Sequence, residues 1–172
     1  MHAITCELIA YLDAQRSVLK SAFESVPPER RDHSPAPERW SAANIVEHLA
    51  IVEARISRLL SDRIEEARPE LSAATSTEAI LPRIDYKRMY DRSTRVKAPE
   101  TAIPTGLDAT SAWTALESAG SMMRAMLIAN DGLALSPVTH PHPRFGLLSV
   151  YEWIAFLGAH EVRHAEQIRE GR

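Results

Sequence analysis

Residues 150–168 read VYEWIAFLGAHEVRHAEQI, and this stretch decides how the chain folds. Its apolar positions advance by three or four residues, the spacing that places side chains on one face of a helix. The stripe runs through Val150, Trp153, Leu157, His160, His164 and Ile168. Because two histidines continue an apolar stripe, we expect both imidazoles to face the protein core.

The segment 160–164 also fits the pattern H-E-x-x-H, in which two histidines four residues apart can bind one divalent metal ion. Zinc peptidases with this pattern take a third ligand from further along the chain, whereas only eight residues follow His164 here. No strand that could align a peptide is visible either. We therefore expect a metal site of another kind, with Glu161 as its neighbour rather than as a general base.

The distribution of proline indicates where the helices lie. All 11 prolines fall outside four segments, about 2–25, 41–66, 110–130 and 147–170, and each segment carries an apolar stripe at helical spacing. Ser149 with Glu152 forms a capping box, and Ser41 can cap the second segment. We predict an all-α fold without strands, a four-helix bundle forming a single domain over residues 1–172.

The links between the predicted helices are unequal in length. Residues 26–40 and 131–146 are proline-rich loops of medium length, whereas residues 67–109 form a long link that can cross the bundle. Apolar residues in this link predict that it packs against the bundle, with one short helix near 85–92. They are Leu71, Ile80, Leu81, Ile84, Tyr86, Met89 and Tyr90.

A third histidine lies in phase on the second predicted helix. The stripe of that helix runs through Ile45, His48, Val52, Ile56 and Leu59. A single buried imidazole is usually explained by hydrogen bonds to its ring nitrogens. Three imidazoles from two helices instead match the ligand number of catalytic zinc sites that keep an open position. We therefore predict a metal site on His48, His160 and His164.

Other histidines and the single cysteine carry weaker signals. His140 and His142 precede the last helix, and His160 lies roughly 15 Å along that helix, so we expect the pair to belong to a packed loop. Cys6 is expected to be a small buried apolar residue. His2 and His33 show no pattern. Side chains expected to line the pocket are Tyr11, Trp113, Trp153 and Arg163.

The composition argues against several classes of protein. A net charge of −3 gives no broad electrostatic surface for nucleic acid or an anionic membrane. No apolar run approaches the roughly 20 residues of a membrane span, and the first residues lack the features of a secretory signal. One cysteine excludes an internal disulfide and a cysteine-built metal site. We expect a cytoplasmic protein that acts on a small molecule.

Three stretches resemble the motifs of one family. Residues 40–49, WSAANIVEHL, resemble its "W-S-x-x-x-x-x-x-H-L" start of helix two. Residues 142–148, HPRFGLL, resemble its "H-P-x-F-G-x-L" approach to the last helix, and residues 160–168, HEVRHAEQI, resemble its "H-x-x-R-H-x-x-Q-I" helix. In order and spacing, the chain thus resembles the DinB-like superfamily, also called DinB/YfiT-like, along nearly its whole length.

This resemblance implies a four-helix bundle with a long crossover between helices two and three. It implies a divalent metal, most often nickel or zinc, on three histidines that map to His48, His160 and His164. Characterised members include transferases that use bacillithiol, mycothiol or glutathione, and a mycothiol-dependent maleylpyruvate isomerase. The resemblance therefore favours a thiol-dependent S-transferase with a low-molecular-weight thiol as co-substrate, and it favours a homodimer.

The same three ligands leave two alternatives open. A metal-dependent hydrolase would use identical residues to activate water. A non-catalytic bundle, either metal-stabilised or a stress-response binding protein, would instead close the site with a fourth protein ligand. Three imidazoles accept nickel, zinc, iron or copper, so the sequence does not choose the metal.

Overall fold

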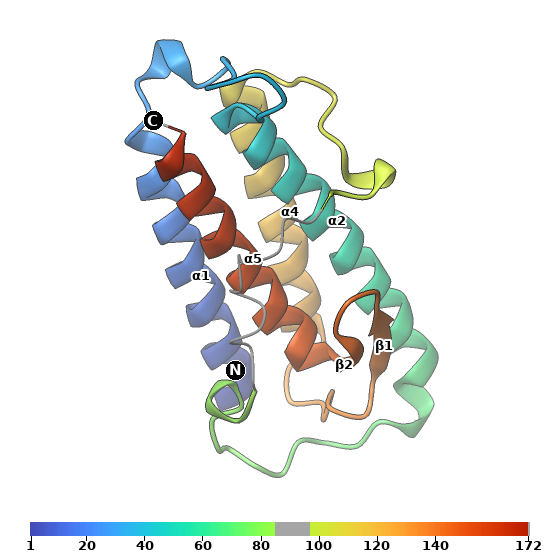
Figure 1. The fold of residues 1–172 in the computed structure, drawn as a ribbon. Helices are drawn as coiled ribbons and strands as arrows, with labels where there is room; N and C mark the ends of the chain where they lie inside the picture. The colour runs from blue at the N-terminus through green and yellow to red at the C-terminus, as the bar shows by residue number, and fades with distance from the viewer. Residues whose placement is uncertain (85–96, 172) are drawn as a thin grey trace.

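Helices dominate the computed structural model, which describes residues 1–84 and 97–171. Within these ranges the α-helices are α1 (Ala3–Glu24), α2 (Ala42–Ala67), α4 (Ala109–Ala129) and α5 (Val150–Glu170). An antiparallel hairpin of β1 (Thr139–His142) and β2 (Gly146–Ser149) precedes α5 (Figure 1). The predicted, mostly helical fold is confirmed, whereas the prediction of no strands is wrong.

The helices are arranged so that α2 and α4 run in the same direction, as do α1 and α5 (Figure 1). Near the starts of α2 and α4, the Leu107 amide donates to Glu47 Oε2 at 2.9 Å. At their ends, Arg68 Nη2 donates to Asn130 Oδ1 at 2.8 Å. The link over 68–108 therefore joins opposite ends of two parallel helices.

Side-chain caps set the points at which α2 and α5 begin. The Ser41 hydroxyl accepts from the Asn44 amide at 3.0 Å, and the Asn44 side chain accepts from the Ser41 amide at 3.2 Å. Ser149 and Glu152 make the same reciprocal pair, as predicted. This capping box starts α5 at Val150 rather than near residue 147. Residues 147–149 instead belong to β2, which follows a turn at Gly146 with φ 77°.

The core forms where the apolar faces of the helices meet. Its largest fully buried side chains include Leu8, Leu19, Ile45, Leu60, Ile64, Leu116, Met123 and Ile154. Burial of each such side chain contributes roughly 1.5–3 kcal/mol to folding.

Close contact between α1 and α5 depends on Gly158, because a Cβ there would lie 2.3 Å from the Tyr11 ring. The Tyr11 hydroxyl donates to the Ala155 carbonyl on the same stretch of α5.

Part of the long link packs on the core, as its apolar residues predicted. Leu71, Ile80, Leu81 and Ile84 contact a buried cluster to which α1, α2, α4 and α5 all contribute. The Glu7 carboxylate fixes this segment by accepting from the amides of Ile80 and Leu81 at 2.8 and 3.1 Å. The short helix expected near 85–92 lies outside the described residues.

The predicted burial of Cys6 is wrong, because this side chain is exposed. Cys6 lies about 200° around α1 from both Ile4 and Leu8, which form the buried face. The helical stripe thus placed it on the solvent side, although its residue type favoured burial.

No helix within residues 1–84 and 97–171 combines the length and apolar character that crossing a bilayer requires.

Candidate metal centre

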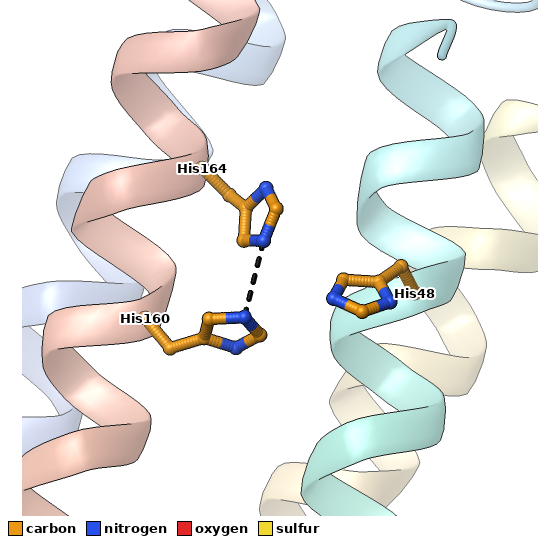
Figure 2. Close-up of side chains that lie close together, drawn as sticks. All are labelled: His48, His160 and His164. Carbon is orange, nitrogen blue, oxygen red and sulfur yellow. Dashed lines mark hydrogen bonds between the residues drawn. The ribbon is translucent and has the colours of Figure 1, made fainter. Parts of the chain in front are cut away.

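The three predicted histidines come together between α2 and α5 (Figure 2). One ring nitrogen from each of His48, His160 and His164 lies within 4.8 Å of the others. Because His160 and His164 are one helical turn apart, their Nε2 atoms approach to 3.1 Å. The His48 ring faces both from α2, with ring centroids 5.3 and 5.0 Å away. The cluster therefore has the form of a three-imidazole metal site.

Hydrogen bonds orient two of the imidazoles with their Nε2 atoms toward the centre. His48 Nδ1 donates to the Ala102 carbonyl at 2.7 Å, and His164 Nδ1 donates to Gln167 Oε1 at 2.9 Å. A ring that donates from Nδ1 keeps a lone pair on Nε2, as metal ligation requires. His160 differs, because its Nδ1 atom is buried without a hydrogen-bond partner among the described residues.

Burial favours the uncharged form of His48 and His160. It lowers the pKa of His48, although the hydrogen bond to Ala102 opposes part of this shift. The pKa of His160 lies well below its ordinary value, first because of burial and then because of the nearby His164 and His48. Neutral imidazole is the form that binds a metal ion. Burial of His48 and His160 therefore favours the protonation state that binding of a cation requires.

The spacing of the ligand atoms can be tested against metal geometry. Two imidazole nitrogens on a tetrahedral zinc ion, each about 2.0–2.1 Å from the metal, lie roughly 3.3 Å apart. The observed separation of 3.1 Å between His160 Nε2 and His164 Nε2 is close to that value. Three imidazole nitrogens suit a borderline cation such as zinc or nickel. The residues present therefore fit a divalent metal ion.

Glu47 and the long link position His48. This buried carboxylate accepts from the Thr105 amide and hydroxyl at 2.7 and 2.6 Å, and from the amides of Gly106 and Leu107 at 3.0 and 2.9 Å. Burial alone would raise the pKa of Glu47, but these hydrogen bonds outweigh it and lower the pKa. The segment held in this way also carries Ala102, whose carbonyl orients His48. Sequence reasoning missed this role, because a carbonyl carries no residue-specific signal.

Aromatic rings close the side of the cluster nearest the hairpin. Phe156 stacks on His160 with centroids 5.3 Å apart, and His142 contacts Phe156 from β1. His142 also packs against Phe145, and burial followed by the charge of Arg144 lowers the His142 pKa to about 4. These contacts agree with the packing role expected for this segment. They make His142 part of the wall beside His160.

The aromatic residues expected to line the pocket lie in different places. Trp153 is near the site, where its Nε1 donates to the His140 carbonyl at 3.1 Å. Trp113 instead stacks on Phe23 at 5.1 Å in another part of the core. Trp40, which was not among the expected lining residues, contacts His48 with ring centroids 5.0 Å apart. Two further residues were expected to line the pocket, Tyr11 and Arg163, and they lie on α1 and α5 respectively.

Glu161 belongs to a second polar cluster, formed with Arg16 and Glu53. Arg16 Nη2 pairs with Glu53 Oε2 at 2.6 Å and with Glu161 Oε1 at 2.7 Å, joining α1 to α2 and α5. Burial raises the pKa of Glu53 to about 7, despite the opposing charge of Arg16. Burial also raises the pKa of Glu161. This ion network was not visible in the sequence, because its members are far apart along the chain.

Fold and site together define a mostly helical protein with a three-histidine cluster that can hold a metal ion. The chain belongs to the DinB superfamily, whose family model matches residues 11–168. It is also similar to "Uncharacterized protein YuaE" of Bacillus subtilis (strain 168), with 25% identity over 154 residues, or 83% of each chain. No solved structure matches the chain significantly. The family resemblance carried by the three sequence motifs is thus confirmed.

Proposed function

We propose that this protein is a divalent-metal-dependent enzyme, with nickel or zinc on His48, His160 and His164. In the reaction we propose, the thiolate of a low-molecular-weight thiol forms a carbon–sulfur bond to an electrophilic small molecule. The bond from that carbon to its leaving group breaks, and the leaving group departs with the proton that the thiol gave up. The observation that carries the proposal is the convergence of three imidazoles, two of them held by carbonyl acceptors on Nδ1. Membership of the DinB superfamily is compatible with such a site.

A bound divalent cation would lower the pKa of a thiol or a water molecule, which supplies a nucleophile at neutral pH. The protein itself orients the imidazole rings and surrounds them with apolar side chains that exclude water. Ala102 and Gln167 fix two ring tautomers, while Trp40 and Phe156 cover the imidazoles with apolar surface. Glu161 is paired with Arg16, so we assign it to that ion pair rather than to proton transfer in the reaction.

Metal binding is tested by elemental analysis of the purified protein and by titration of the metal-free form with zinc and nickel. We expect one equivalent in the wild type and loss of stoichiometric binding in His164→Ala. His140→Ala serves as the matched control, since His140 lies on β1 and is not one of the three clustered histidines. Full metal occupancy in His164→Ala would refute the assignment of the ligands.

The transferase reaction is tested by incubating the metal-loaded protein with glutathione, bacillithiol or mycothiol and a generic electrophile. We expect metal-dependent loss of free thiol with at least one of them, and no loss with His164→Ala. A parallel arm without thiol, using ester and amide substrates, detects hydrolysis by the same site. Activity in neither arm would favour a non-catalytic metal-binding protein.

The homodimer expected from the family is a separate prediction, checked by light scattering.

A further inference from the structure

A cavity of about 130 Å³ lies next to the histidine cluster, at the start of α2 and the end of α5. Ile45 in its lining precedes His48 by three residues, and Gln167 follows His164 by three. On a helix this spacing is about one turn, or about 5 Å along the axis. The cavity and the cluster therefore occupy successive levels of the same interface between α2 and α5.

Two side chains contact both the cavity and the histidines. Trp40 lines the cavity and lies 5.0 Å from the His48 ring, measured between ring centroids. Gln167 also lines the cavity and accepts the hydrogen bond from His164 Nδ1. A ligand that displaces or reorients either side chain would therefore act directly on a residue that touches the cluster.

The lining combines basic side chains with an apolar floor. Arg30, His33 and Arg39 come from the segment between α1 and α2, and the described residues of the lining include no acidic side chain. Buried apolar residues form the floor, namely Val26, Ile45 and Ile168. Among the residues that the structure describes, Arg30 and Arg39 have neither an ion pair nor a side-chain hydrogen bond. Two unpaired guanidinium groups beside apolar surface suit a carboxylate that is attached to an apolar body.

We infer that this cavity binds a small organic carboxylate, with its anionic group between Arg30 and Arg39 and its apolar body over Ile45 and Ile168. The volume equals roughly four water molecules at about 30 Å³ each, which suits one end of a small molecule. The remainder of the molecule extends past Trp40 and Gln167 toward the histidines. This last step rests on the proposed function and identifies the enzyme's substrate or co-substrate as an organic acid.

Carboxylate binding is tested by calorimetric titration of the metal-free protein with benzoate. We expect saturable 1:1 binding that weakens as salt is added, because the arginines are partly exposed and their charges are screened. The double variant Arg30→Gln/Arg39→Gln should bind at least about tenfold more weakly, since it loses charge-assisted hydrogen bonds. Arg58→Gln/Arg124→Gln removes the same charge from other surface positions on α2 and α4 and should bind as tightly as the wild type.

Benzamide, a neutral analogue of the same shape, separates anion recognition from apolar binding. We expect it to bind at least about tenfold more weakly than benzoate. Equal affinity for both compounds, no saturable benzoate binding, or unchanged affinity in the Arg30/Arg39 double variant would each overturn the inference. Circular dichroism of each variant verifies that the helices are intact.

The two proposals fail in distinguishable ways. His164→Ala should lose the metal but retain benzoate binding, whereas the Arg30/Arg39 double variant should retain stoichiometric metal and lose benzoate. A wild-type protein that binds benzoate but takes up no stoichiometric metal would refute the metal assignment alone. Metal binding without saturable benzoate binding would refute the cavity assignment alone.

Discussion

Two polar clusters are buried next to each other along α5, and they differ in the charges of their members. Arg16, Glu53 and Glu161 contain opposite charges that pair across three helices at 2.6 and 2.7 Å. The histidine cluster contains three groups of one kind, and one ring nitrogen of each lies within 4.8 Å of the others (Figure 2). The adjacent residues His160 and Glu161 thus belong to two different environments.

This difference indicates which cluster ties the fold together and which one could hold a metal ion. Buried charges are tolerated when they are paired and hydrogen-bonded, and Arg16 supplies that pairing from α1 and also donates to the Leu116 carbonyl on α4. The histidine cluster instead brings together three side chains of one kind, with no opposite charge among them. We therefore expect changes at Arg16 to affect folding, and changes at the histidines to affect metal binding.

The largest effect on stability is expected from Arg16→Met. Removal of the guanidinium leaves two carboxyl groups buried together, and breaking a buried ion pair in this way costs about 3–5 kcal/mol of unfolding free energy. Urea denaturation of the metal-free protein measures the loss. Arg124→Met is the control, since its pair with Asp13 is largely exposed and should contribute less than about 1 kcal/mol. Equal effects of the two substitutions would contradict the structural role of the buried cluster.

The pH dependence of stability should separate the two clusters. The folded-state pKa of Glu53, about 7, lies above its ordinary value of 4.5, so the folded protein retains a proton that the unfolded chain releases. The contribution of protonated Glu53 to the unfolding free energy is therefore complete below pH 4.5 and is lost as the pH rises toward 7. The histidines act oppositely, because burial lowers the pKa of His48 and His160 below 6.5. Their contribution is therefore lost as the pH falls below 6.5.

Glu53→Gln should isolate the contribution of the histidines. Because the variant lacks the carboxyl group, its unfolding free energy should increase more steeply between pH 5 and 7 than that of the wild type. Between pH 5 and 7, the unfolding free energy of the variant should rise by about 2–3 kcal/mol more than that of the wild type. This is the size expected from the raised pKa of one buried carboxyl group. Denaturation curves at several pH values, recorded with a chelator, provide the measurement. Parallel curves for the two proteins would show that Glu53 is ionised in the folded wild type at pH 5.

A smaller effect on stability is expected from Glu47→Gln, which tests how His48 is oriented. The glutamine side chain cannot accept the charge-assisted hydrogen bonds that the 105–107 backbone donates to Glu47. We therefore expect the unfolding free energy to fall by about 1–3 kcal/mol. Metal affinity should fall about tenfold or more, because the Ala102 carbonyl that orients His48 is held less firmly. Calorimetric titration with zinc measures the affinity, and Glu65→Gln on the exposed face of α2 is the control. Unchanged zinc affinity in Glu47→Gln would show that the long link does not position His48.

Several features of the fold could be predicted because they depend on residues close together in the sequence. Proline-free segments with apolar stripes gave the four helices to within a few residues. The capping box of Ser149 and Glu152 is likewise local and is confirmed. The hairpin was missed, because each strand has four residues and β1 includes Pro141, which leaves no alternating apolar pattern. His2 was also missed, although its side chain caps α1 by accepting from the Ile4 amide.

The sequence by itself determined the helices, the family and the inward phase of His48, His160 and His164. These follow from a periodicity of 3.6 residues and from short-range capping, which a single sequence displays directly. Only the tertiary structure decided that Glu161 pairs with Arg16, that Ala102 orients His48, and that Arg30 and Arg39 border a cavity beside Gln167. The physical reason is distance along the chain. Charges and carbonyl groups act over a few ångströms, and folding brings them together from segments whose local patterns contain no record of one another.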